Sequence, residues 1–201
     1  ACVNDFIAAL GARAFRRPLG SEEQDAFRTF FDEERTEQGV EEAAQQVLRA
    51  FVMSSGYLYR FELGPMQDGL LQLNNYEIAS AIAYLLIDGP PDADLMAAAA
   101  EGSLSDAETR RTHVQRLTES WNDMPGVNRF FDEHLGVSHV LSTPKDEDVF
   151  PGFTPEAREA AAASTLAFVG HILFEDDRRL STLISSDTVF VNRDNDVFYG
   201  M

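Results

Sequence analysis

Histidine and serine side chains are the first candidates for chemistry in this sequence. His134 and His139 lie five residues apart, whereas two histidines that bind one metal ion from a single helix lie about four apart. Ser164 and His171 fall on one expected helix, but seven residues separate them by roughly 10 Å along its axis, which is too far for a catalytic dyad. These spacings favour hydrogen-bonded histidines at or beside the core over metal ligands or catalytic groups.

Carboxylates offer two further sites. Asp132 and Glu133 are neighbours that point in different directions around a helix, so paired-carboxylate catalysis would need a partner from a distant segment. In "NRDND", Asn192, Asp194 and Asp196 place oxygen ligands at alternate positions, as calcium loops do. The segment lacks the glycine and the terminal glutamate of such loops. It therefore predicts either a weak calcium site or a turn that is closed by its own side chains.

Two adjacent arginines, Arg16 and Arg17, precede a proline in "ARAFRRPLG". Because Pro18 prevents the helix from continuing, both cations fall near its end, where each would stabilise the exposed carbonyl groups by about 0.3 to 1 kcal/mol. The alternative is an ion pair that docks another domain. The structural role at a helix junction is the simpler interpretation.

The charge of the chain limits the classes of partner that it can bind. It has 34 acidic and 16 basic residues and a formal net charge of −18, and Lys145 is its only lysine. Such a surface repels nucleic acid and anionic membranes, and no apolar run approaches the roughly 20 residues that cross a bilayer. Cys2 is the single cysteine and no C-x-x-C-H motif is present, so we expect no cofactor in this chain and haem only in flanking or partner domains.

The first third of the sequence predicts a small domain of three helices, residues 1–63. Apolar residues recur three and four positions apart along the first helix: Phe6, Ile7, Leu10 and Ala14. Ser21 with Gln24 indicates a capping box for the second helix, and the third is expected from Val40 to about Met53. The glycines and proline of residues 64–72 indicate a linker.

Residues 73–201 predict a larger helical domain. Three helix starts are expected from capping residues: Asn74 with Glu77, Ser105 with Glu108, and Thr154 followed by Pro155. Only "TVFV", Thr188 to Val191, has the pattern of an extended segment. The sequence thus predicts an all-α protein of two packed helical units, with at most one short extended segment near its C-terminus.

Several separated blocks carry a family resemblance. "LNNYEIASAIAYLLIDGPPDADLMAAAAEGSLSD" (residues 73–106) resembles the opening of the planctomycete and myxobacterial cytochrome-associated family known as domain of unknown function 1592. "FEDDRRLSTLISSDTVFVNRDNDVFYG" (residues 174–200) is similar to the end of that family. "FRRPLGSEEQDAF" (residues 15–27) resembles domain of unknown function 1595, the small helical domain that usually precedes it. The blocks occur in the family's order and together cover nearly the whole chain.

The resemblance implies an exported, multidomain protein that is often encoded or fused with c-type cytochrome modules. It implies a periplasmic, outer-membrane associated or extracellular location, and no established reaction. This chain departs from the family at His134, where tryptophan is usual, and near Ser164, where glutamate is common. It also has "NRDNDVFYG" where the family has an asparagine, glutamate, leucine and alanine pattern. No role for those positions is carried over to this chain.

Two classes of function follow. The first is an exported noncatalytic scaffold or docking module of a larger redox-associated protein, with the other domains of its polypeptide and a c-type cytochrome as partners. The alternative is part of an enzyme, an oxidoreductase or hydrolase whose active site is completed by flanking domains. A deep pocket that joins His134 or His171 to acidic groups would favour the enzyme. Exposed apolar patches would favour docking.

The C-terminal segment "TVFVNRDNDVFYGM" is rich in apolar side chains that need a covering surface. Such a segment is typical of a junction between two domains of one polypeptide. We therefore expect the chain to be an excised or processed piece of a longer polypeptide. We expect Phe198 and Tyr199 to pack against the chain's own helices, each ring contributing about 1.5 to 3 kcal/mol, and to guide the polypeptide into the next domain. The docking candidates are therefore these two rings together with Arg16 and Arg17.

Overall fold

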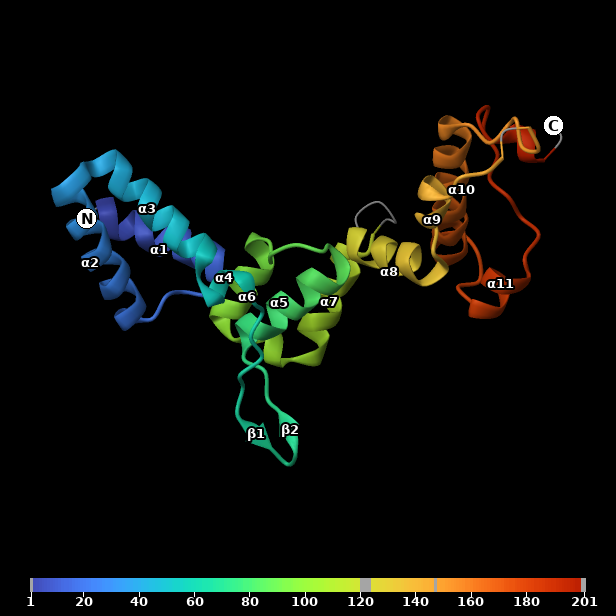
Figure 1. Cartoon of the computed structure of the whole chain (residues 1–201). Coiled ribbons are helices and arrows are strands. Elements are labelled where there is room, and N and C mark those ends of the chain that lie inside the picture. The colour runs from blue at the N-terminus through green and yellow to red at the C-terminus, as the bar shows by residue number, and fades with distance from the viewer. Residues whose placement is uncertain (1, 120–123, 147, 200–201) are drawn as a thin grey trace. The chain divides into compact units, whose positions relative to one another are not determined.

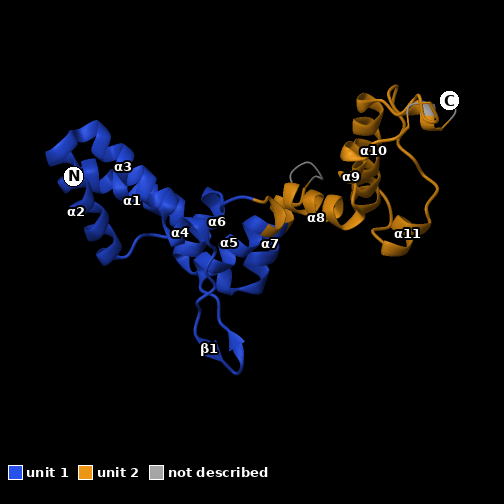
Figure 2. Ribbon diagram, viewed as in Figure 1, with its two compact units in different colours: residues 1–84, 89–114 blue, residues 85–88, 115–201 orange. Residues whose placement is uncertain are grey.

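The structure is a computed structural model that describes residues 2–119, 124–146 and 148–199, and these residues are mostly helical (Figure 1). They form two compact units (Figure 2). Unit 1 comprises Ala1–Tyr84 and Gly89–Val114, and unit 2 comprises Leu85–Asp88 and Gln115–Met201. The predicted all-α class is confirmed. The boundaries between the two compact units do not fall within residues 64–72, where a linker was expected.

Unit 1 begins with the helices α1 (Cys2–Phe15), α2 (Ser21–Gln38), α3 (Val40–Met53) and α4 (Ser55–Leu58). The first three pack against one another. Their core consists of buried apolar residues: Ile7, Ala14, Leu19, Phe31, Ala43, Val47 and Phe51. Gly11 permits this packing, because a Cβ atom there would lie 2.3 Å from Cδ1 of Leu19. The apolar spacing of the sequence thus gave both bounds of α3 correctly.

The start of α2 differs from its prediction by one residue. Gly20 is the capping residue, and its N–H donates to Oε2 of Glu23 at 2.8 Å. The capping box predicted from Ser21 and Gln24 is therefore wrong. The carboxylate of Glu23 reaches back to the helix start and also binds Arg17, a combination that the amide of Gln24 cannot offer.

After α5 (Asn75–Leu86) the chain forms α6 (Ala93–Glu101), the short 3₁₀ helix η1 (Ser103–Ser105) and α7 (Ala107–Leu117), and α7 belongs to unit 1 as far as Val114. Oδ2 of Asp106 accepts a hydrogen bond from the N–H of Thr109 at 2.8 Å, so Asp106 caps α7. The predicted cap, Ser105 with Glu108, is wrong. The hydroxyl of Ser105 is occupied elsewhere, because it donates to the carbonyl of Gly102 at 2.8 Å.

Helix α5 (Asn75–Leu86) starts as predicted. Oδ1 of Asn74 accepts from the N–H groups of Tyr76 at 2.9 Å and Glu77 at 3.0 Å. Glu77 returns the interaction, because its Oε2 accepts from the N–H of Asn74 at 2.8 Å. This reciprocal capping box forms from residues three positions apart, so local sequence was sufficient to predict it.

A β-hairpin lies between α4 and α5, inside the segment expected to be a linker. β1 (Met66–Gln67) pairs antiparallel with β2 (Leu70–Leu71), with Met66 opposite Leu71. Asp68 and Gly69 form the turn with φ values of 52° and 79°. Both values are positive, as the tight hairpin turns favoured by Asp-Gly require. The predicted extended segment, Thr188 to Val191, is not in a strand.

Unit 2 contains α8 (Pro125–Leu135), α9 (His139–Ser142), α10 (Pro155–Phe174), α11 (Leu180–Ser185) and the 3₁₀ helix η3 (Asp196–Phe198). Helices α8, α9 and α11 each contact α10. Thr154 caps α10 as predicted, because its Oγ1 accepts from the N–H of Ala157 at 3.2 Å. Gly136 ends α8 with a φ of 67°, in the left-handed region. Buried apolar residues of α10 are Ala157, Ala160, Val169 and Ile172.

Candidate functional site

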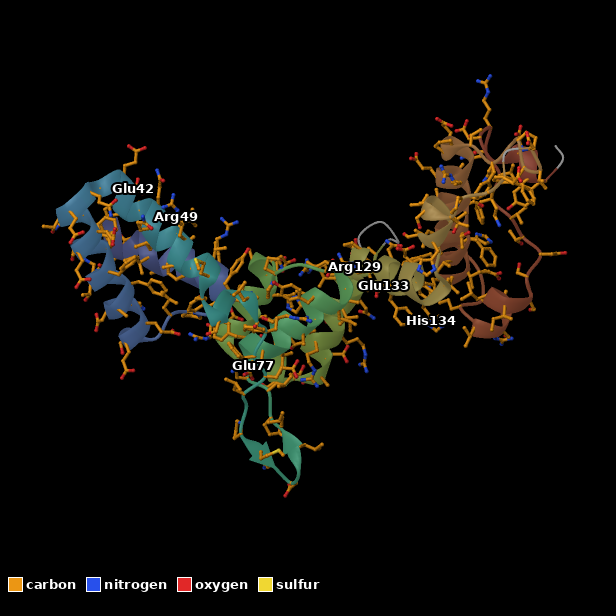
Figure 3. The ribbon with its side chains drawn as sticks, in the orientation of Figure 1. Glu42, Arg49, Glu77, Arg129, Glu133 and His134 are labelled. Atoms are coloured by element: carbon orange, nitrogen blue, oxygen red, sulfur yellow. The ribbon has the colours of Figure 1, made fainter. Side chains whose placement is uncertain are left out.

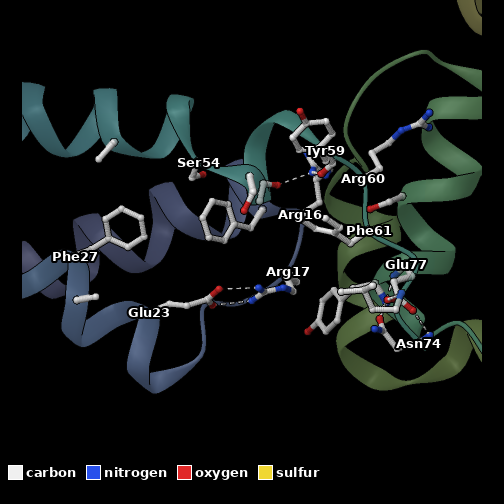
Figure 4. Close-up of a pocket in the computed structure, with 18 of the residues that line it drawn as sticks. Arg16, Arg17, Glu23, Phe27, Ser54, Tyr59, Arg60, Phe61, Asn74 and Glu77 are labelled. Atoms are coloured by element: carbon white, nitrogen blue, oxygen red, sulfur yellow. Dashed lines mark hydrogen bonds and ion pairs between the residues drawn. The ribbon is translucent and has the colours of Figure 1, made fainter. Parts of the chain in front are cut away.

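Unit 1 contains a cavity of about 710 Å³ (Figure 4). This volume is within the range of pockets that hold small molecules. Its aromatic lining residues are Phe15, Phe27, Phe30, Tyr59, Phe61 and Tyr76. Its charged lining residues are Arg16, Arg17, Glu23, Arg60 and Glu77. A chain with many more acidic than basic residues thus places three arginines around one cavity.

Arg16 is buried and makes hydrogen bonds to backbone carbonyls, chiefly of a distant segment. It follows α1 with a φ of 57°, an uncommon conformation for a residue with a side chain. Its Nη2 donates to the carbonyls of Gly56 at 2.7 Å and Tyr59 at 2.8 Å. Its Nη1 donates to the carbonyl of Ala14, in the last turn of α1, at 3.2 Å. The predicted stabilisation of α1 is therefore the smaller part of its role, which is mainly to hold the chain after α4 against the end of α1.

Arg17 forms a local ion pair. Its Nη1 and Nη2 donate to the two carboxylate oxygens of Glu23, each at 2.8 Å. The hydrogen bond from Arg17 is the main cause that lowers the pKa of the Glu23 carboxyl. The same bond raises the pKa of Arg17. The pair joins the loop after α1 to the first turn of α2, so the ion pair formed by Arg17 lies within unit 1.

Sequence reasoning missed Arg60 and Tyr84. The Cζ atoms of Arg60 and Arg16 lie 4.6 and 5.8 Å from the centre of the Tyr84 ring. Across the described ranges of the chain, no carboxylate forms an ion pair with either arginine. Two cations thus lie over the ring of Tyr84. The available signal was the run "YLYRF", residues 57–61, in which an arginine stands between aromatic residues.

The histidines expected as candidates in unit 2 are not brought together. His134 stacks on Phe130 of the same helix, with ring centroids 5.5 Å apart and an interplanar angle of 6°. Figure 3 labels it beside Glu133 on α8. His139 begins α9, beyond the end of α8 at Gly136. The stacking gives His134 a packing role on its own helix.

Ser164 and His171, both on α10, have separate partners. The Ser164 hydroxyl donates to the carbonyl of Phe190 at 2.5 Å. Nδ1 of His171 lies 2.8 Å from Oε2 of Glu175, one turn further along the chain. These contacts agree with the expectation that the two side chains do not form a dyad.

Asp132 also has a structural partner. Its Oδ1 accepts from the N–H of Ser138 at 2.8 Å. The bond closes the chain reversal after α8. Among the described residues, no hydrogen bond joins Glu133 to Asp132, so paired-carboxylate chemistry gains no support.

The calcium candidates lie in a turn fixed by amide side chains. Oδ1 of Asn192 accepts from the N–H groups of Asp194 at 2.9 Å and Asn195 at 3.1 Å. Asn195, which sequence reasoning missed, is fully buried. Its Oδ1 accepts from the N–H of Asn192 at 2.8 Å, and its Nδ2 donates to the carbonyls of Ala160 and Phe190, both at 3.3 Å. These bonds attach the segment to α10.

These bonds correspond to the predicted alternative, a turn closed by its own side chains. In residues 2–119, 124–146 and 148–199, no three His, Cys, Asp or Glu side chains are grouped as a metal site requires. A calcium site at Asn192, Asp194 and Asp196 stays a prediction.

The expected burial of Phe198 and Tyr199 is wrong. The two side chains are 41% and 44% exposed, although the Phe198 ring lies 5.9 Å from that of Phe153. Asn195 attaches this segment to α10 by hydrogen bonds, so the two rings need not be buried to hold it. Residues 200 and 201 lie outside the described part of the chain.

Exposed apolar side chains gather along one continuous segment of unit 1. Eight large ones lie between residues 57 and 71: Tyr57, Leu58, Tyr59, Phe61, Leu63, Met66, Leu70 and Leu71. Figure 1 shows that this segment includes the hairpin, which projects from the helices of unit 1. Single exposed apolar residues are ordinary, whereas eight in one continuous segment form a dense apolar group.

The fold and the site define a mostly helical protein with an exposed apolar hairpin and an arginine-lined cavity in unit 1. The chain belongs to the family of proteins of unknown function designated PSD4 (DUF1592), whose model matches residues 73–201. A second family of unknown function, PSD5 (DUF1595), matches residues 2–62. Both predicted families and their order are confirmed. No curated protein and no solved structure gave a match.

None of the helices in the described ranges combines the length and the apolar content needed to cross a bilayer.

Proposed function

We propose that the chain is a noncatalytic docking module that binds a basic protein through residues 57–71. The observation that carries this proposal is the group of eight exposed apolar side chains on that segment. Burial of each such side chain on binding contributes up to about 1.5 to 3 kcal/mol before the cost of association. Several of them acting together are sufficient for a specific interface.

The hairpin is held in a defined position at its base. The N–H of Gln72 donates to the carbonyl of Pro65 at 2.9 Å. Oε1 of Glu77 accepts from the N–H of Leu63 at 2.9 Å, so the capping residue of α5 also fixes the entry to the hairpin. A Cβ atom on Gly64 would lie 1.8 Å from the carbonyl oxygen of Gln72, which shows how closely the two arms approach. This order lowers the entropic cost of binding.

Two features of the hairpin favour a protein partner. A hairpin of two strands has two edges whose backbone groups can pair with an added strand. Glu62 and Asp68 outnumber Arg60 in this segment, so it has a small negative charge within a chain of net charge −18. A basic partner with an apolar groove complements both properties.

The family resemblance supports the finer parts of the proposal. These are an exported location, periplasmic, outer-membrane associated or extracellular, and a c-type cytochrome as the basic partner. Haem would then belong to that partner or to flanking domains. The enzyme alternative required a pocket that joins His134 or His171 to acidic groups, and neither histidine lines the cavity of unit 1.

The test compares two pairs of exposed apolar residues. The double variant Leu70→Ser, Leu71→Ser alters the hairpin, and Leu180→Ser, Ile184→Ser alters similarly exposed positions of α11. Binding of each chain to a purified basic c-type cytochrome is measured by calorimetry. We expect the hairpin variant to bind at least about tenfold more weakly and the α11 variant to match the original chain. Absence of binding by the original chain, or equal losses in both variants, would overturn the proposal.

A further inference from the structure

The cavity of unit 1 has a fixed aromatic wall. The Phe27 and Phe51 rings stack with centroids 3.9 Å apart, and Phe15 meets Phe51 edge-on at 5.6 Å. Phe51 is fully buried, so the two rings that line the cavity, Phe15 and Phe27, are attached to the core. A preformed wall of this kind suits a flat apolar body, because little ordering is required when it binds.

The two carboxylates that line the cavity are already committed. Glu23 accepts from the guanidinium of Arg17 and from the N–H of Gly20. Glu77 accepts from the N–H groups of Leu63 and Asn74. Each carboxylate is thus engaged in holding the backbone, and Glu23 in addition neutralises Arg17. Neither is placed to neutralise the remaining arginines.

The cavity therefore keeps an excess of positive charge and of hydrogen-bond donors. Arg16 donates only to backbone carbonyls, which solvate its charge without cancelling it. Arg60 lies over Tyr84, and Figure 4 shows its guanidinium directed away from Glu77. Arg17 donates from Nη1 to Pro18 and Glu23 and from Nη2 to Glu23, and among the described residues no group accepts from its Nε–H. Three arginines against two glutamates leave one net positive charge.

We infer that this cavity binds a small aromatic carboxylate. Its ring system lies against Phe15 and Phe27, and its carboxylate faces the remaining donors of Arg17. Arg16 and Arg60 supply the positive potential that compensates the ligand's charge. The ligand has one negative charge on an apolar body, and the cavity complements it with one net positive charge and aromatic walls. The inference does not rest on the docking proposal, although Tyr59, Phe61 and Leu63 line the cavity and also belong to the exposed segment of residues 57–71.

The test uses naphthalene carboxylate as the probe and its uncharged carboxamide as the matched compound. Calorimetry with the full chain should give one binding site for the carboxylate and at least about tenfold weaker binding of the carboxamide. Raising the salt concentration should weaken binding of the carboxylate only. Equal binding of the two compounds, or no binding of either, would overturn the inference.

Two double variants locate the site. Arg17→Gln, Glu23→Gln removes the ion pair at the cavity, and Arg49→Gln, Glu42→Gln removes an exposed ion pair of α3 that does not line it (Figure 3). Both preserve the net charge of the chain. We expect only the first to weaken carboxylate binding, by about tenfold, with carboxamide binding unchanged. Equal effects of the two variants would contradict the assignment.

Arg60→Gln gives an independent measurement, because this side chain is exposed and its replacement leaves the hydrogen bonds of Arg16 and Arg17 in place. Carboxylate binding should weaken severalfold and become less sensitive to salt. Unaltered affinity and unaltered salt dependence in Arg60→Gln would remove the proposed source of positive potential. Melting curves of every variant establish that it is folded.

Discussion

Replacement of Arg16 by glutamine should destabilise unit 1 far more than the same replacement of Arg17. The two residues are adjacent and carry the same charge, so the pair controls for composition and net charge. Arg16 is 7% exposed and donates two short hydrogen bonds, to the carbonyls of Gly56 and Tyr59. The Arg17 side chain is 42% exposed, and its ion pair with Glu23 is accessible to water.

The magnitude follows from these contacts. A hydrogen bond from a charged donor contributes about 1.5 to 3 kcal/mol, and the shorter glutamine side chain cannot span both distant carbonyls. Arg16→Gln should therefore cost about 3 kcal/mol, which corresponds to a loss of roughly 10 °C in the melting temperature of unit 1. Arg17→Gln should cost less than about 1 kcal/mol, because exposed ion pairs contribute little. The uncommon φ of Arg16 is the same in the original and the variant, so it does not alter the comparison.

The assay is thermal unfolding followed by circular dichroism, combined with hydrogen exchange of the amides in α1 and α4. Hydrogen exchange is needed because two units need not unfold together. Faster exchange in Arg16→Gln should appear at the end of α1 and throughout α4. If the two variants have equal melting temperatures, or if α4 keeps its protection in Arg16→Gln, the role assigned to Arg16 is wrong.

Three further predictions concern stability. Folding lowers the pKa of the Glu23 carboxyl from 4.5, so its ion pair stabilises the fold above pH 4.5. This stabilisation is lost as the pH falls through the lowered pKa. The melting temperature of Glu23→Gln should therefore decline less steeply in acid than that of the original chain. Asn195→Ala should lower the stability of unit 2 by about 2 kcal/mol, measured by urea denaturation, and a variant as stable as the original would show that its hydrogen bonds contribute nothing net. Asp106→Ala should lower the stability measurably and Ser105→Ala much less in the same assay, and the reverse order would restore Ser105 as the cap of α7.

The sequence by itself determined most of the helices. The bounds of α3 and the starts of α5 and α10 followed from apolar spacing and from caps at Asn74 and Thr154. Each of these signals acts over three or four residues, so the folded chain adds little to it. Two caps were misplaced by one residue because Glu23 and Asp106 had neighbours of similar capping ability.

The hairpin was missed although its signal is local. Asp68 and Gly69 stand between Met66–Gln67 and Leu70–Leu71, and the Asp-Gly dipeptide favours a tight turn. The glycines and the proline of the same segment also fit a linker, and two-residue strands are too short for their alternation to decide between these readings. That its apolar side chains stay exposed could be learned only from the structure.

Only the tertiary structure decided what the arginines and the buried asparagine do. The acceptors of Arg16 at Gly56 and Tyr59 lie 40 and 43 residues away, and Asn195 binds the carbonyl of Ala160 across 35 residues. A long side chain can reach many carbonyls, and the one it meets depends on how the helices pack. The cavity has the same origin, because Arg17, Arg60 and the wall of phenylalanine rings come together only when α1 to α5 have folded against one another.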